Sequence, residues 1–200
     1  MAVVVPVYFD YASSLCFIAS VIGSRLEAEL GVTLDWRPVE IAAQYPSWRK
    51  GALIGGDTHG KIARVASETG VPVMIPTRWL DSRAALQGAL FARDHDRFDA
   101  YHARVFRAAF ADGEDIGDMR VMERIAVAAG LTATEFADAV AAERYAPQLA
   151  SELAEAQRLG VTGYPTFLLG RFPLTGIQPF ETMRRLFARH IERQTIRVLH

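Results

Sequence analysis

The fold of this chain is decided by two stretches, Gly160-Val161-Thr162-Gly163-Tyr164-Pro165-Thr166-Phe167 and Asp10-Tyr11-Ala12-Ser13-Ser14-Leu15-Cys16. In the first stretch, Pro165 stands just before a short apolar run, and a proline in that position can be cis. A cis bond would turn the preceding backbone outward, so that the N–H and C=O of Tyr164 could pair with an extended ligand. The alternative is an ordinary trans proline at the start of a strand.

The second stretch lies where a predicted strand passes into a predicted helix. Residues 2–9 are almost continuously apolar, which predicts a strand covered on both faces. Ser13 or Ser14 can cap a helix over residues 15–30, and Gly31 stands where such a helix can end. Residues 32–39 alternate like a second strand. A β-α-β unit with parallel strands and a right-handed crossover is therefore expected at the start of the chain.

The remaining pattern changes from helical back to strand-like. Residues 41–76 are rich in glycine and predict loops with short helices, one of them over residues 61–68. Residues 81–159 are helical in pattern, and Thr132 with Glu135 predicts a capping box for one of these helices. Residues 166–169 and 172–174 predict a hairpin, and residues 180–194 a closing helix. The predicted order is β-α-β, a helical block, then β-β-α.

Composition excludes several classes of protein. The chain has 200 residues, 50% of them apolar, which suits one domain or a small domain with an insertion. A net charge of −1 gives no basic field for nucleic acid or for an anionic membrane. One cysteine allows no intramolecular disulfide, and no pair among the five histidines has metal-ligand spacing, so no metal is expected. Neither a signal peptide nor a run of 18 apolar residues is evident, so a cytoplasmic protein is expected.

The start of the first helix is the first place where chemistry could occur. Free N–H groups and the positive end of the helix dipole would stabilise an anion there, such as a thiolate brought by a ligand, and the Ser13 hydroxyl could donate to it. The alternative is that Ser13 is only an N-cap. Cys16 lies about one turn further on, where a thiol can be reactive, but a free cysteine is also often a small buried hydrophobe.

Taken together, these features resemble a known family. The order of elements is similar to the thioredoxin fold with a DsbA-type helical insertion, and more closely to the branch that contains 2-hydroxychromene-2-carboxylate isomerases and kappa-class glutathione transferases. The matching features are Phe9-Asp10, Ser13, Trp36-Arg37-Pro38, Asp81-Ser82-Arg83-Ala84, Asp112-Gly113 with Asp115-Ile116, and Gly160 to Phe167. The resemblance implies an α/β thioredoxin-like domain from residues 1–40 and 160–200, with a helical insertion domain over residues 41–159.

The resemblance also implies a cofactor and a reaction. DsbA-like oxidases carry Cys-x-x-Cys at the helix start, whereas this chain has Ser13-Ser14-Leu15-Cys16 and so lacks the two sulfurs of a dithiol cycle. In the isomerase and kappa branch a serine at the first position hydrogen-bonds the sulfur of glutathione. The implied catalytic residues are Ser13 and Cys16. The implied glutathione-binding residues are Ser13, Tyr164 beside a cis Pro165, Asp81, Ser82 and Gln178.

The implied activity is that of a glutathione-dependent isomerase or transferase acting on a small conjugated or aromatic electrophile. The isomerase reaction would proceed by thiolate addition, bond rotation and elimination. Because glutathione carries two carboxylates, Arg37, Lys50 and Lys61 are the cations to seek near the cleft. The branch usually has asparagine where this chain has Asp81, and it usually ends the γ-glutamyl site with an aspartate where this chain has Gln178-Pro179.

Two other functions remain open at this point. One is a DsbA-like thiol-disulfide oxidoreductase that works through Cys16 alone, by mixed disulfides. The other is a non-catalytic thioredoxin-fold module that binds a peptide along the Tyr164 edge. For all three functions the expected partner is a small molecule or a peptide rather than nucleic acid or membrane, and the resemblance suggests a homodimer.

Overall fold

The fold is built around a four-stranded mixed sheet at the centre of the computed structural model, which describes residues 2–198, with side chains to residue 194. The strands are β1 (Val4–Phe9), β2 (Thr33–Pro38), β3 (Thr166–Leu169) and β4 (Phe172–Thr175), in the order β2-β1-β3-β4. β1 pairs parallel with β2 and antiparallel with β3, and β3 pairs antiparallel with β4. The predicted β-α-β and β-β-α units are thus both present and share one sheet.

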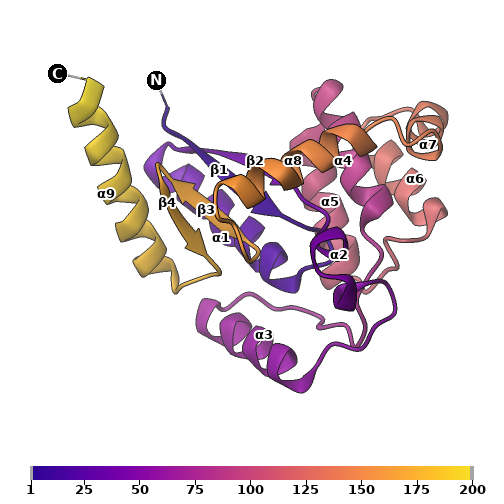
Figure 1. The fold of residues 1–200 in the computed structure, drawn as a ribbon, viewed down its shortest axis with the longest axis horizontal. Helices are drawn as coiled ribbons and strands as arrows, with labels where there is room; N and C mark the ends of the chain where they lie inside the picture. Colours follow the sequence, from indigo (N-terminus) through magenta and orange to yellow (C-terminus); the bar gives the residue numbers. More distant parts are fainter. Residues whose placement is uncertain (1, 199–200) are drawn as a thin grey trace.

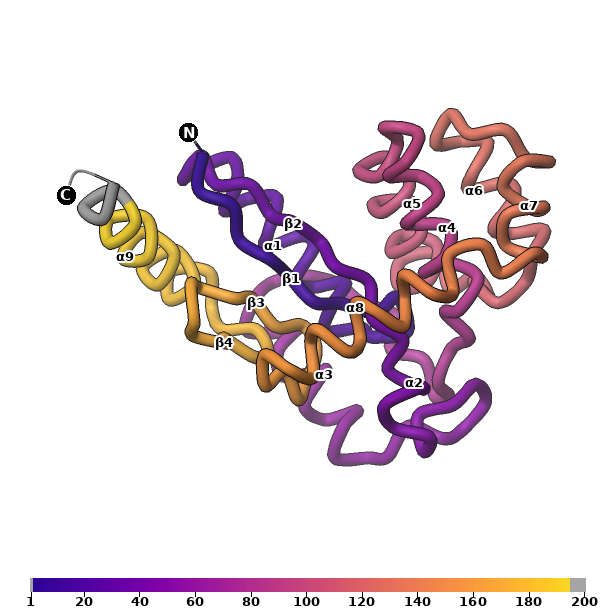
Figure 2. The backbone as a smooth tube through the Cα atoms, turned by 45° about the horizontal axis from the view of Figure 1, so that its top comes forward, coloured from indigo at the N-terminus to yellow at the C-terminus, as the bar shows by residue number. Residues whose placement is uncertain are grey.

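The first crossover helix begins and ends where the sequence predicts. Helix α1 (Ser14–Leu30) has Ser13 as its N-cap, and Gly31 ends it with a φ of 65°, a conformation that glycine adopts without strain. Helix α9 (Phe180–Val198) closes the chain and packs against α1. Figure 2 shows the β3–β4 hairpin between β1 and α9. These elements bring the start of α1 and the start of β3 to neighbouring positions in the fold.

Helical elements connect β2 to β3 along the chain. They are α2 (Ile41–Gln44), a 3-10 turn over Pro46–Trp48, α3 (Gly56–Thr69), α4 (Arg83–Asp94), α5 (Phe98–Phe110), α6 (Met119–Ala128), α7 (Ala133–Ala141) and α8 (Ala146–Arg158). Helices α4 to α7 gather at one end of the sheet, while α3 lies apart from them (Figure 1). The predicted capping box is wrong in part: Thr132 stands at the N-cap of α7, but its side chain makes no capping hydrogen bond.

An aromatic cluster joins the sheet to helix α5. The ring of Phe9 meets Trp36 at 5.7 Å and His102 at 4.8 Å between centroids, both edge to face. Tyr11 packs on Phe106 at 4.8 Å. Such pairs each contribute about 0.5–1.5 kcal/mol beyond the area that they bury. The cluster therefore fixes the helical segment relative to the end of β1, where Asp10 and Ser13 follow.

No helix within residues 2–198 is both long enough and apolar enough to cross a membrane.

Candidate functional site

Ser13 occupies the predicted place at the start of α1. Its Oγ accepts a hydrogen bond from the backbone N–H of Cys16 at 3.3 Å, so the serine is an N-cap, as one of the two interpretations had it. The cap does not use up the hydroxyl, because an oxygen that accepts one bond still carries a proton to donate. Ser13 is 7% exposed, so its hydroxyl is largely buried at the start of α1. The hydroxyl can cap the helix and still has a proton to donate.

Cys16 lies one turn further along α1 and is fully buried. Burial raises the pKa of its thiol to about 12, and hydrogen bonding with the Ser13 side chain offsets only part of that rise. The thiolate is the reactive form of cysteine, and very little of it is present at neutral pH when the pKa is so high. This environment matches the alternative of a small buried hydrophobe and argues against the nucleophilic role implied by the resemblance.

The Tyr164–Pro165 peptide bond is cis, as the sequence suggested it could be. Strand β3 begins at the next residue, Thr166, which faces Tyr8 of β1, so the proline lies beside the end of β1 and close to the start of α1. The Tyr164 hydroxyl donates to Gln44 Oε1 at 2.6 Å, and the Tyr45 hydroxyl donates to the carbonyl of Thr162 at 2.8 Å. These two bonds tie the loop before Pro165 to the end of α2.

Tyr164 also interacts electrostatically with Asp10 and Cys16, the residues around the start of α1. Its pKa is raised, first by burial and then by several groups that include Tyr45, Asp10 and Cys16. The phenol therefore stays protonated and acts as a hydrogen-bond donor at physiological pH. The structure thus brings Ser13, Cys16, Tyr164 and Pro165 into one region, which was the expectation from the sequence.

Asp10 is a residue to which sequence reasoning gave no role of its own. Its carboxylate is buried and accepts from the N–H groups of Ala12 at 2.8 Å and Ile41 at 2.7 Å, and the Ser82 side chain also hydrogen-bonds to it. Desolvation outweighs these bonds and raises the pKa of Asp10 to about 6. The feature of the sequence that could have pointed to Asp10 is its position as a carboxylate directly after a buried apolar strand. Asp10 holds three segments together: the loop before α1, the start of α2 and the start of α4.

Asp81 and Ser82 are brought to the same place, beside a small cavity next to Ala12 that also reaches Lys50 and two tryptophans, Trp48 and Trp79. Lys50 Nζ lies 3.7 Å from a carboxylate oxygen of Asp81. Asp81 stands where the isomerase and kappa branch usually has asparagine, so the additional negative charge of this chain has a cationic partner. Both groups are largely exposed, and such pairs contribute at most about 1 kcal/mol. Lys50 is therefore free to exchange this partner for the carboxylate of a ligand.

The other residues suggested by the resemblance are less closely connected to Ser13. Gln178 is exposed in the loop between β4 and α9, and no recorded contact among residues 2–198 joins it to Ser13 or Tyr164. Arg37 pairs with Asp35, Glu152 and Glu155 instead of facing the cavity. Lys61 lies on α3 and does not line the cavity beside Ala12. Of the three cations sought near the cleft, the structure thus places Lys50 there.

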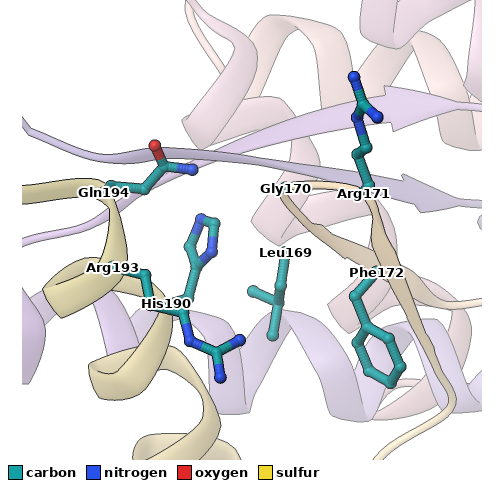
Figure 3. Close-up of a pocket in the computed structure, with 7 residues that line it drawn as sticks. All are labelled: Leu169, Gly170, Arg171, Phe172, His190, Arg193 and Gln194. Atoms are coloured by element: carbon teal, nitrogen blue, oxygen red, sulfur yellow. The ribbon is translucent and has the colours of Figure 1, made fainter. Parts of the chain in front are cut away.

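A larger cavity lies elsewhere, between the β3–β4 hairpin and α9 (Figure 3). The side chains of His190 and Arg193 border it, while that of Arg171 points away from both (Figure 3). Burial and the charge of Arg193 lower the pKa of His190, so Arg171 and Arg193 are the cations here, and neither belongs to the region around Ser13. Among the described residues, no group of three or more histidine, cysteine, aspartate or glutamate side chains could hold a metal ion.

A mixed sheet of this order, a capped helix after its first strand and a cis proline before its third define a thioredoxin-like protein with a helical segment between the two halves. The model of the DsbA-like thioredoxin domain matches residues 4–188, and the chain belongs to that family. The predicted fold class and superfamily are confirmed. Solved structures of similar fold include an isomerase and a disulfide reductase.

Individual relatives are more distant. The uncharacterized protein YwbO of Bacillus subtilis is 25% identical over 185 residues, which cover 88% of this chain and 91% of that protein. Among solved structures, a 2-hydroxychromene-2-carboxylate isomerase has a TM-score of 0.78 at 19% identity and covers 98% of each chain. The cytosolic disulfide reductase DsbM of Pseudomonas aeruginosa, solved with GSH, has a TM-score of 0.72 at 20% identity, covering 95% of this chain and 100% of that one. At these identities the structures show the shared fold.

Proposed function

We propose that this protein is a glutathione-dependent isomerase or transferase that acts on a small conjugated or aromatic electrophile. The observation that carries the proposal is the pair of residues at the ends of the Ser13–Cys16 tetrad: the first is a serine, and the second is a fully buried thiol of raised pKa. The chain therefore has no reactive sulfur of its own at the place where its family performs sulfur chemistry. A thioredoxin-like site without a reactive sulfur suits a ligand that brings one.

The residues present fit glutathione as that ligand. The Ser13 hydroxyl and the free N–H groups at the start of α1 favour a thiolate over a thiol, because hydrogen bonds and the helix dipole stabilise negative charge. The backbone beside the cis Pro165 can pair with the cysteinyl backbone of a tripeptide. Lys50 can receive one of its carboxylates. The structure of DsbM, which has a similar fold, was solved with GSH.

Each side chain then has a separate task in the reaction. When bound, glutathione would supply the nucleophilic sulfur for the reaction with the conjugated substrate. Ser13 would hold the negative charge on that sulfur, and the Tyr164 hydroxyl, which donates to Gln44 Oε1 at 2.6 Å, would fix the loop before Pro165. Trp48 and Trp79 stack at 4.8 Å and line the cavity next to Ala12, whose volume of about 30 Å³ is too small for an aromatic substrate. Asp10 fixes the loop that carries Ser13.

The proposal extends to organisation and location. Residues 1–40 and 160–200 would form the domain that holds the cysteinyl part of glutathione, and residues 41–159 the insertion that covers the substrate. Reduced glutathione is the abundant cytosolic thiol, so a cytoplasmic enzyme is proposed, and its partner is a small molecule. A homodimer is proposed from the resemblance alone, and sedimentation of the purified chain tests it.

Isothermal titration calorimetry with reduced glutathione tests the function. We expect binding to the wild-type protein, at least tenfold weaker binding to Ser13→Gly, and unchanged binding to Cys16→Ala. Glycine is the suitable replacement because it removes the hydroxyl while costing an N-cap only a few tenths of a kcal/mol. Absence of binding at millimolar glutathione would contradict the proposal and favour the peptide-binding module instead. Loss of binding in Cys16→Ala alone would favour chemistry through Cys16.

A further inference from the structure

One arginine at the start of α4 joins three segments of the chain that meet beside the candidate site. Arg83 Nη1 donates to Glu40 Oε2 at 2.6 Å, and Glu40 is the residue just before α2. Arg83 Nε and Nη2 donate to the two carboxylate oxygens of Glu143, at 3.0 and 2.8 Å, in the turn between α7 and α8. A two-bond pair of this kind fixes the direction as well as the distance between its partners. Arg83 therefore holds the start of α2 and the α7–α8 turn against the start of α4.

The backbone conformation of Glu143 points to a role for its side chain. Its φ is 47°, in the left-handed region that favours glycine and in which a Cβ atom is crowded. Glycine at this position would relieve the crowding but would leave Arg83 without its two-bond partner. The turn thus carries a carboxylate at a place where the backbone alone favours glycine.

The neighbours of Glu40 and Arg83 in the sequence both hold Asp10. Ile41, directly after Glu40, donates its backbone N–H to Asp10 Oδ2 at 2.7 Å. Ser82, directly before Arg83, hydrogen-bonds to the same carboxylate with its side chain. Asp10 in turn holds the loop before α1 through a second backbone N–H. A displacement of Glu40 or Arg83 is therefore transmitted through Asp10 to the loop at the helix start.

Arg83 also decides the charge that the cavity beside Ala12 presents to a ligand. The charged residues that line this cavity are Asp10, Glu40, Lys50 and Asp81. Three of the four are acidic, so an anionic ligand meets a negative lining unless these charges are compensated. Lys50 pairs with Asp81, and Arg83 pairs with Glu40. Arg83 is not among the described residues that line the cavity, so it acts there through Glu40.

The charge of Glu40 acts on Asp10 as well as on a ligand. Burial raises the pKa of Asp10 first, and the negative charge of Glu40 raises it further. Three other titratable groups interact with Asp10 electrostatically, namely Tyr11, Cys16 and Tyr164. Burial raises the pKa of each of these three, so they stay protonated and uncharged at physiological pH. Lys50 and Asp81 across the cavity carry opposite charges. Glu40 is thus the charge beside Asp10 whose influence depends on Arg83.

We propose that Arg83 is a positioning residue of the candidate site, which fixes the loop of Ser13 through Asp10 and compensates the charge of Glu40 at the cavity. The inference rests on the proposed function only for the identity of the ligand, glutathione. The arrangement of Arg83, Glu40 and Glu143 around Asp10 does not depend on that identity.

The titration of Asp10, followed by NMR of its carboxyl carbon, tests the inference without any ligand. In Arg83→Gln the charge of Glu40 is uncompensated, and the pKa of a carboxyl rises beside a like charge, so the titration midpoint should move up by about 0.5 pH units or more. In the double variant Arg83→Gln with Glu40→Gln, the midpoint should return to the wild-type value or fall below it. Removal of a second charge would not repair a variant that is merely loosened. Arg83→Lys keeps the charge and should titrate nearly as the wild type does.

Calorimetry with reduced glutathione at pH 7 tests the consequence for the ligand. Affinity should fall about three- to fivefold in Arg83→Gln, the size of one partly exposed charge interaction. It should recover only in part in Arg83→Lys, because lysine cannot form the two-bond pair with Glu143. The control is Arg184→Gln on α9, whose side chain is 41% exposed against 39% for Arg83 and pairs with Glu181 of the same helix. This control should change neither the Asp10 titration nor the affinity.

Three results would overturn the inference. They are an Asp10 midpoint that is unchanged in Arg83→Gln, a midpoint that is raised equally in the double variant, and full glutathione affinity in Arg83→Gln. If the wild-type protein binds no glutathione, the proposed function fails, whereas the Asp10 titration still decides whether Arg83 controls this carboxyl.

Discussion

The backbone N–H of Cys16 donates to the side chain of Ser13 at 3.3 Å, so the two ends of the tetrad at the helix start are held together by a capping bond. The bond places the serine oxygen at the helix start and the cysteine sulfur inside the core. Cys16 is fully buried and Ser13 is 7% exposed, so the serine is the more accessible of the two ends. The proposed function rests on this difference: the site would bind a sulfur anion that a ligand brings, because its own thiol has a raised pKa and is buried.

The first prediction concerns the reactivity of Cys16. A pKa of about 12 instead of the ordinary thiol value of 9.0 lowers the thiolate fraction at neutral pH by about a thousandfold. We expect alkylation of the native protein by iodoacetamide to be slower than alkylation of the urea-unfolded protein by at least a hundredfold at pH 8, with full labelling once unfolded. Mass spectrometry after timed quenching measures both rates. Rapid labelling of the native protein would show that Cys16 is accessible and would restore a role in catalysis.

The sequence predicted the architecture well because its signals are local. Apolar runs, Ser13 and Gly31 act over a few residues, and they fixed the strands and α1. The resemblance predicted that Pro165 lies near the start of α1, and in the structure the two lie close together. Burial of Cys16 and the links made by Asp10 to Ile41 and Ser82 depend on contacts between distant segments, which no local pattern encodes. The sequence therefore left two interpretations of Cys16 open and gave Asp10 no role, and the folded chain decides between the former and supplies the latter.

The second prediction concerns the pH dependence of stability. The folded-state pKa of Asp10 is about 6, above the value near 3.9 expected for the unfolded chain, so the folded state binds the proton more tightly. Its contribution to stability is fully present below about pH 4 and is lost as the pH rises through 6. Two pKa units correspond to a free energy on the order of 3 kcal/mol.

Urea denaturation at several pH values measures this contribution. The wild-type free energy of unfolding should fall between pH 4 and 6 relative to that of Asp10→Asn, which lacks the titrating group. The control is Asp138→Asn, at an exposed position on α7, whose curve should run parallel to that of the wild type. Parallel curves for wild type and Asp10→Asn would show that Asp10 has an ordinary pKa.

The third prediction compares two glycines inside helices. A Cβ atom at Gly88 of α4 would lie 2.1 Å from the Tyr101 hydroxyl oxygen and 2.6 Å from a ring carbon of Phe136, both in the packed core. Gly88→Ala should therefore destabilise the protein by about 1–3 kcal/mol despite the better helix propensity of alanine. At Gly60 of α3 nothing lies within 4 Å, so Gly60→Ala should stabilise it by about 0.5–1 kcal/mol. Urea denaturation measures both, and a stabilised Gly88→Ala would mean that α4, α5 and α7 pack more loosely.

The fourth prediction concerns the charge beside the proposed glutathione site. Asp81 and Lys50 lie 3.7 Å apart at the cavity next to Ala12, and a ligand carboxylate has to compete with Asp81 for this lysine. Removing the competing charge in Asp81→Asn should strengthen glutathione binding about three- to tenfold, since a surface pair is worth at most about 1 kcal/mol and the repulsion is also removed. An asparagine keeps an oxygen that can accept the Arg83 amide, which Asp81 now accepts at 3.2 Å.

The same titration with lysine variants locates the effect. Lys50→Gln should weaken glutathione binding by a similar factor, and Lys61→Gln, on α3 and away from the cavity, should leave it unchanged. Calorimetry at low and at high salt adds a further check, because the differences between variants should shrink as salt screens exposed charges. If Asp81→Asn and Lys50→Gln both bind glutathione as the wild type does, the carboxylates of glutathione lie away from Lys50.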